Sequence, residues 1–214
     1  MSATTPSERT AGGTGVARPG ERTAGSTGGF TMDRLGWAPW LTPLAADELT
    51  EEHHEALVDR ARAASPYFLL LARDPGILKA RMHTDNDIFH NSGGGLPRAE
   101  RELAATATSR RNGCVFCASV HARFAAHYAK RPDDVLRLLE EGVHASQDDR
   151  WRAIIDASAA IAATPGELGE AHVEALRAAG LDDLAISDVI HAAAFFNWAN
   201  RLMLSLGEPV QEDS

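Results

Sequence analysis

A helical repeat of buried-type side chains in the second half of the chain constrains the fold most. Within residues 148–163 such side chains recur every three or four positions, at Trp151, Ile154, Ile155, Ser158, Ile161 and Ala162. This spacing is typical of one face of an α-helix. No segment shows the strict alternation of apolar and polar residues that indicates a half-buried strand. The pattern therefore predicts a protein built from helices that pack against one another.

Start and stop signals place further helices on both sides of this repeat. Thr50 is a candidate N-cap for a helix that we expect to run to about Ala64. Asp74-Pro75 begins another helix, and Asp182 or Asp183 begins the last and longest one, which ends before Gly207. We expect an all-α bundle of about seven or eight helices and no sheet.

The first 30 residues differ in composition from the rest of the chain. They are rich in Gly, Thr, Ser and Pro, and they contain the near-repeat ERTAGGTG and ERTAGSTG, which starts at Glu8 and again at Glu21. Such a segment buries too little apolar surface to offset the entropy lost on ordering. We expect a disordered tail over residues 1–30 and one domain over residues 31–214, with Met32 as a candidate for the true start.

The stretch LGWAPWLTPL after this tail is apolar and interrupted by prolines. Trp37 and Trp40 carry much apolar surface, yet two prolines prevent a regular helix. We expect an extended arm. It packs either on its own domain or on a neighbouring subunit.

The two cysteines of the chain, Cys114 and Cys117, form a C-x-x-C motif that carries the chemistry. Asn112-Gly113 predicts a break between helices, so both thiols would lie at the start of a helix over residues 114–129. There the helix dipole stabilises a thiolate. His121 follows Cys117 by four positions and shares its face. We expect a pair of thiols that can close into a disulfide.

Glu102 precedes the motif on a helix that we expect to begin at Pro97. If the two helices pack together, its carboxylate can reach the thiols. A desolvated carboxylate can accept a proton near neutral pH.

The set Glu102, Cys114, Cys117 and His121, in the pattern E-x(11)-C-x-x-C-x(3)-H, resembles the alkylhydroperoxidase (AhpD-like) branch of the carboxymuconolactone decarboxylase superfamily. The likeness extends to GLPRAERELA, NGCVFCASVHAR and FFNWANRLMLSLGEP, and it is strongest to peroxidase-related proteins of this branch. The resemblance implies an all-α, AhpD-like fold, a homotrimer or hexamer, and reduction of alkyl hydroperoxides without a cofactor. It also implies that Cys117 attacks the peroxide, that Cys114 resolves the product, and that an external dithiol or thiol reductase restores both. AhpD itself has a histidine before the second cysteine, where this chain has Phe116, so the proton relay would rest on Glu102 and His121.

Three other interpretations of the cysteine motif remain open. Cys114, Cys117 and His121 could bind zinc, although no fourth ligand is evident nearby. The cysteines could also be inert core residues. If the protein instead catalyses a decarboxylase-like reaction, the cysteines take no part in the chemistry. We expect no metal and favour the redox interpretation.

Composition excludes several other classes of function. The formal net charge is −9, and no basic cluster suggests binding to nucleic acid or to an anionic membrane. No apolar run approaches the ~20 residues that span a bilayer. Two cysteines without an export signal suggest a reducing, cytoplasmic environment.

Polar residues on the last helix are weaker candidates for a functional site. We interpret Asn197, Asn200 and Arg201 as a structural network or subunit contact. His191 is a minor catalytic candidate on the same helix.

Overall fold

The computed structural model of this chain describes residues 29–211. Most of the predicted tail lies outside these residues. The last residue of the predicted tail, Phe30, is part of the folded structure. It packs against the main core, and its ring centroid lies 4.1 Å from the Arg110 guanidinium carbon. The folded domain therefore includes residue 30, just before the predicted boundary.

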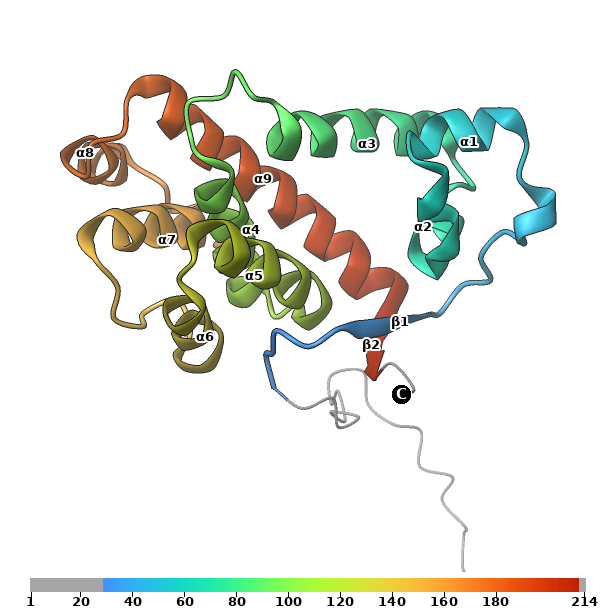
Figure 1. Ribbon diagram of the computed structural model, residues 1–214, viewed down its shortest axis with the longest axis horizontal. Helices are drawn as coiled ribbons and strands as arrows, with labels where there is room; N and C mark the ends of the chain where they lie inside the picture. The colour runs from blue at the N-terminus through green and yellow to red at the C-terminus, as the bar shows by residue number, and fades with distance from the viewer. Residues whose placement is uncertain (1–28, 212–214) are drawn as a thin grey trace, which may run out of the picture.

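The prediction of a helical protein is confirmed. Residues 29–211 form nine α-helices, slightly more than expected (Figure 1). They are α1 (Glu51–Leu57), α2 (Pro66–Leu71), α3 (Pro75–His90), α4 (Arg98–Asn112), α5 (Val115–Ala129), α6 (Pro132–Glu141), α7 (Asp149–Ala162), α8 (Glu170–Ala178) and α9 (Asp183–Leu206). No helix within the described residues is long and apolar enough to cross a lipid bilayer.

Side-chain caps begin several helices at the expected residues. The carboxylates of Asp74, Asp148 and Asp182 accept backbone N–H groups in the first turns of α3, α7 and α9. Helix α1 begins after Thr50, as predicted, but it ends at Leu57 because Val58 has a φ of 62°. The expected continuation to Ala64 is instead a separate 3-10 helix, η2 (Arg60–Ala64).

Helix α4 forms the centre of the molecule. It packs against α5, α7 and α9, and Figure 1 shows these helices around it. Its residues 100–109 are all buried, so α4 has almost no solvent face. The main core joins α4 and α5 to α6, α7 and the first half of α9. A second apolar cluster lies beside it and contains both cysteines.

The expectation of no sheet is wrong. Strand β1 (Leu35–Pro39) pairs antiparallel with β2 (Gly207–Gln211), and Trp37 faces Pro209 in the register. Each strand contains a proline, which is tolerated because a two-stranded sheet consists of edge strands only. The LGWAPWL arm thus packs on its own domain, by pairing with residues 207–211 of the same chain.

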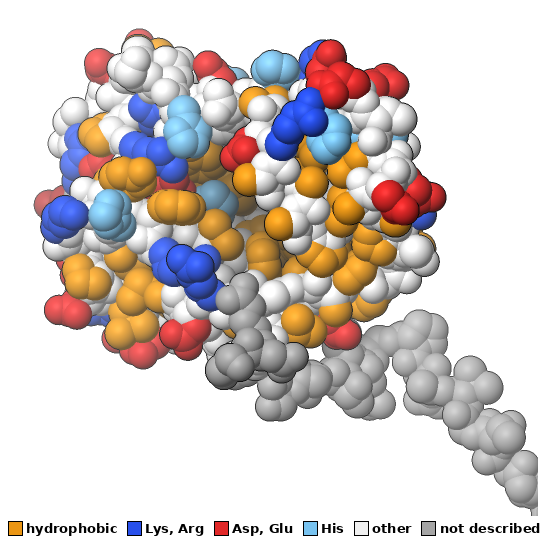
Figure 2. All heavy atoms as spheres, turned by 45° about the vertical axis from the view of Figure 1, so that its right-hand side comes forward, with side chains coloured by type: hydrophobic (Ala, Val, Ile, Leu, Met, Phe, Trp, Pro, Cys, Tyr) orange, Lys and Arg blue, Asp and Glu red, His pale blue; other side chains and the backbone are white. Residues whose placement is uncertain are grey.

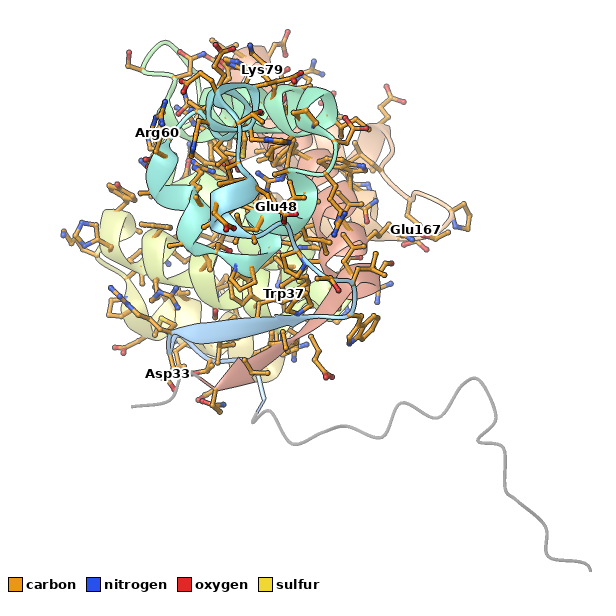
Figure 3. The ribbon with its side chains drawn as sticks, turned by 90° about the vertical axis from the view of Figure 1, so that its right-hand side faces the viewer. Asp33, Trp37, Glu48, Arg60, Lys79 and Glu167 are labelled. Carbon is orange, nitrogen blue, oxygen red and sulfur yellow. The ribbon has the colours of Figure 1, made fainter. Side chains whose placement is uncertain are left out.

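Trp37 fastens this sheet to the helices. Its side chain points from β1 toward the helical body and is buried, whereas Trp40 is exposed (Figure 3). The Trp37 ring packs edge-on against Tyr67 of α2, with centroids 5.3 Å apart. Thus the sheet closes the second apolar cluster on the side of the cysteines.

Candidate active site

The corner between α4 and α5 places both thiols at a helix start. Gly113 adopts a left-handed conformation, with a φ of 78°, and ends α4. The Cys114 N–H then donates to the Ser109 carbonyl at 2.9 Å, and Cys114 becomes the N-cap residue of α5. Cys117 lies in the first turn, so the break predicted at Asn112-Gly113 is confirmed.

The two thiols are buried side by side but have different surroundings. Both cysteines are free. A hydrogen bond with Cys114 holds the pKa of Cys117 below its ordinary value, and the charges of His121 and Arg81 act in the same direction against burial. The same hydrogen bond, together with burial, raises the pKa of Cys114 well above its ordinary value. These surroundings favour the thiolate form at Cys117 and the protonated form at Cys114.

Glu102 lies on α4 next to the cysteine helix. Its carboxylate is almost entirely buried, and its Oε2 lies 2.6 Å from Nδ1 of His121. Its Oε1 accepts a hydrogen bond from Nε of Arg98 at 3.1 Å. A carboxylate at Nδ1 holds the proton on that nitrogen, which leaves Nε2 as the basic atom of the ring.

Two aromatic rings fix the orientation of His121. Phe89 stacks on the imidazole with centroids 5.2 Å apart, and Phe196 meets it edge-on at 4.1 Å. The ring is thus held on two sides and hydrogen-bonded at Nδ1. This restraint holds the ring in one orientation, which a side chain that transfers protons to a bound substrate requires.

A cavity of about 620 Å³ opens onto these groups. Cys117, His121 and Glu102 line it, whereas Cys114 is not part of its wall. Most of its wall is apolar, including Phe89, Phe116, Val120, Phe196 and Met203. Figure 2 shows a hollow walled by hydrophobic side chains on the face it views. All four residues predicted from the sequence are therefore in one place, and Phe116 forms part of the wall.

Several charged or polar residues of this cavity were not predicted from the sequence, among them Arg98, Tyr67 and Arg81. Arg98 could have been found, because it precedes Glu102 by four positions on one helix. Tyr67 and Arg81 come from α2 and α3, and no local pattern relates them to the cysteines.

The other polar candidates lie elsewhere. Asn112 donates to the side-chain oxygens of Asn197 and Asn200, each at 3.1 Å, and Asn200 donates to Ser109 at 3.0 Å. This network ties α9 to the end of α4, which supports its structural interpretation. Asn200 also lowers the pKa values of both thiols by hydrogen bonding. His191 is exposed and lines a different cavity, together with His83 and Asp188.

The zinc interpretation receives no support from the geometry. Among residues 29–211, no group of three or more His, Cys, Asp or Glu side chains is placed to hold a metal ion.

Comparisons with known proteins agree with this description. The model of the carboxymuconolactone decarboxylase family matches residues 75–160. No curated protein sequence matches the chain.

Solved structures with the same fold include two peroxidase-related proteins. One, from Ralstonia eutropha JMP134, has an alkylhydroperoxidase AhpD core. It is 25% identical, with a TM-score of 0.67 over 78% of this chain and 90% of that one. The other, from Silicibacter sp. TM1040, is also 25% identical, with a TM-score of 0.67 over 80% and 91%.

The debrominase Bmp8 has the same fold at lower identity. It is 17% identical, with a TM-score of 0.64 over 78% of this chain and 89% of that one. At this identity the likeness concerns the fold alone. The match to the carboxymuconolactone decarboxylase family model covers the residues that carry the cysteine pair, Glu102 and His121, and the chain has the AhpD-like fold.

Proposed function

We propose that this protein is a thiol-dependent peroxidase that reduces organic hydroperoxides. The observation that carries the proposal is the asymmetry of the thiols. Cys117 lines the cavity and its pKa is lowered, whereas Cys114 does not line the cavity and its pKa is raised. A thiolate at the end of an apolar cavity is the attacking group of this chemistry.

The first step oxidises Cys117. Its thiolate attacks the terminal oxygen of ROOH, the O–O bond breaks, and the other oxygen leaves as RO⁻. Nε2 of His121, which takes the thiol proton, returns a proton to this oxygen and ROH forms. Glu102 holds Nδ1 of the ring and balances the imidazolium charge while the proton is in transit.

The second step closes a disulfide. The Cys114 sulfur attacks the sulfenic sulfur of Cys117, the S–O bond breaks, and water leaves. An external dithiol or thiol reductase then reduces the disulfide and is itself oxidised. A protein with this pair could also act as a disulfide reductase on the same thiols.

The cavity indicates the size and polarity of the substrate. Its wall is mainly aromatic and aliphatic, and its volume of about 620 Å³ lies in the range of small-molecule sites. Hydrogen peroxide would leave most of this apolar surface uncovered. We therefore expect bulky alkyl or aryl hydroperoxides to react faster than hydrogen peroxide.

Stopped-flow oxidation of the fully reduced protein tests the proposal. Cumene hydroperoxide, tert-butyl hydroperoxide and hydrogen peroxide would each be mixed with the wild type, Cys117→Ser and Cys114→Ser. We expect rapid oxidation of the wild type, no reaction for Cys117→Ser, and arrest at the sulfenic acid for Cys114→Ser. Equal, slow oxidation of all three proteins would refute the proposal and would favour a chemistry in which the cysteines are incidental.

A further inference from the structure

Two buried polar groups on residues that line the cavity have no hydrogen-bond partner of normal geometry within the part of the chain that the structure describes. They are the Tyr67 hydroxyl and Nε of Arg81. Tyr67 is 3% exposed and Arg81 is 8% exposed, and both line the cavity that contains Cys117. Leaving a buried donor unpaired costs free energy, so such groups in a cavity point to a ligand that pairs with them.

Packing fixes both side chains in place. The Tyr67 ring meets Trp37 edge-on at 5.3 Å. The Arg81 guanidinium carbon lies 5.3 Å from the Phe68 centroid and 5.5 Å from that of Phe195.

The remaining contacts of Arg81 leave its charge available. Its Nη1 donates to Sδ of Met82 at 3.1 Å and lies 3.9 Å from the Asp85 carboxylate. Asp85 is shared, because Arg62 approaches it to 3.4 Å. A single carboxylate thus balances two guanidinium groups, and this part of the cavity keeps a net positive charge.

Both groups act electrostatically on the cysteine pair. The charge of Arg81 contributes to the lowered pKa of Cys117. Burial, together with the smaller effect of the Cys117 charge, raises the pKa of Tyr67 to about 12, and the charge and hydrogen bonding of Arg81 partly oppose this rise. The phenol is therefore protonated, and a hydrogen-bond donor, throughout the neutral pH range.

We propose that Tyr67 and Arg81 hold the departing oxygen of the hydroperoxide while Cys117 attacks the terminal one. This inference rests on the proposed peroxidase function and adds two catalytic residues to it. When the O–O bond breaks, its electron pair goes to the inner oxygen, which becomes RO⁻. The Tyr67 hydroxyl donates a hydrogen bond to that oxygen, Arg81 supplies a fixed positive charge, and the proton that completes ROH comes from His121.

Replacement of Tyr67 by phenylalanine isolates the hydroxyl. The ring and its packing against Trp37 remain, and a group without a partner is removed, so Tyr67→Phe should melt no lower than the wild type. The comparison variant is Tyr128→Phe, because Tyr128 is the other tyrosine of the chain and lines the same cavity, but it is 43% exposed. Its ring contact with Arg98, at 4.6 Å, survives that change.

The readout is single-turnover oxidation by peroxides whose departing oxygens differ in basicity. With tert-butyl hydroperoxide, whose alkoxide is strongly basic, we expect Tyr67→Phe to react about 10- to 100-fold more slowly. With peracetic acid, which releases a carboxylate, the loss should be under about threefold, because a weakly basic oxygen needs little stabilisation. Alkylation by iodoacetamide, which releases iodide, should be unchanged. Any rate change in Tyr128→Phe should be the same for both peroxides.

The possible outcomes separate this inference from the proposed function. Equal rates for Tyr67→Phe and the wild type with all peroxides would overturn the inference alone. A loss shared by both peroxides and iodoacetamide would also overturn it, because it would show that Tyr67 acts on the thiolate itself. Absence of oxidation of the wild type by any peroxide would instead overturn the proposed function, and the inference with it.

Discussion

At the scale of single residues, the site depends on what surrounds each of two identical thiols. The Cys114 side chain stabilises a negative charge on Cys117 through a hydrogen bond, and the positive charges of His121 and Arg81 add to this effect. Burial alone would raise both pKa values, so the direction for Cys117 comes from its specific neighbours. Reactivity at Cys117 should therefore be sensitive to small changes around it.

The hydrogen bond from Cys114 leads to a pH prediction. Thiolate alkylation accelerates as pH rises through the thiol pKa, so a lowered pKa moves the half-maximal rate of Cys117 below pH ~8.5, the ordinary thiol value. Cys114→Ala removes the donor and should shift this midpoint upward, whereas Cys114→Ser keeps a hydroxyl donor and should shift it less. Iodoacetamide labelling followed by peptide mass spectrometry measures the midpoints. A midpoint at or above 8.5 in the wild type would contradict the assignment of Cys117 as the thiolate.

The Glu102 carboxylate gives a second prediction at this scale. Glu102→Gln removes the negative charge beside Nδ1 of His121, which destabilises the imidazolium formed during proton transfer. We expect hydroperoxide oxidation to slow by about 100-fold or more, since general acid–base catalysis typically contributes about 10²- to 10⁴-fold. Stopped-flow fluorescence would follow the reaction.

A matched control lies on the same helix. Glu100 is also buried and pairs with Arg150 at 2.7 Å, but it does not line the cavity. Glu100→Gln should lower the melting temperature and leave the oxidation rate of the folded protein within about threefold. Equal rate losses in the two variants would remove Glu102 from the mechanism.

At the scale of elements, the α4–α5 corner builds the site and the small sheet closes it. The corner follows from local signals, namely Gly113 after Asn112 and a cysteine at the N-cap. The sheet joins two segments far apart in the sequence. Gly207 sits where the strands meet the helices, and a Cβ at this position would contact the Trp37 ring and the Ala38 carbonyl.

This close approach predicts a stability effect. Gly207→Ala should destabilise the fold by about 1–3 kcal/mol, the usual cost of overpacking, because the Trp37 ring or strand β1 must move. Gly166→Ala is the control, since a Cβ there meets nothing within 4 Å. Chemical denaturation would give both values. Equal stability of the two variants would contradict the tight packing between Trp37 and β2.

The elements also show what sequence can and cannot predict. Local signals, such as the caps at Asp74 and Asp182 and the apolar repeat over residues 148–163, located most helices. The i,i+4 spacing of Cys117 and His121 likewise predicted that these two side chains lie on the same face of α5. The pairing of β1 with β2 could not be predicted, because it depends on contacts between opposite ends of the chain. For the same reason Tyr67 and Arg81 were missed, since α2 and α3 reach the cysteines only through tertiary packing.

At the scale of the whole molecule, apolar side chains on the surface suggest assembly. Several large hydrophobic residues are exposed, and Trp40, Leu41, Leu184 and Trp198 are among them. Such side chains are commonly buried between subunits. We propose that the protein forms a homo-oligomer.

Light scattering in solution tests the oligomeric state. Since one chain has a mass of 22.9 kDa, a trimer or hexamer should give three or six times this mass. The variant Trp40→Ser should lower the mass if this exposed ring lies between subunits. A wild type that remains at the mass of one chain over a wide concentration range would contradict the prediction.

The central claim is that Cys117 and Cys114 form one redox pair inside each chain. The most direct test adds one equivalent of cumene hydroperoxide to the reduced protein without oxygen, counts the thiols and maps the disulfide by mass spectrometry. The account predicts that one peroxide consumes both thiols, that an intrachain Cys114–Cys117 disulfide forms, and that a dithiol restores the starting mass. Two free thiols after complete mixing, or linkage only between chains, would contradict it.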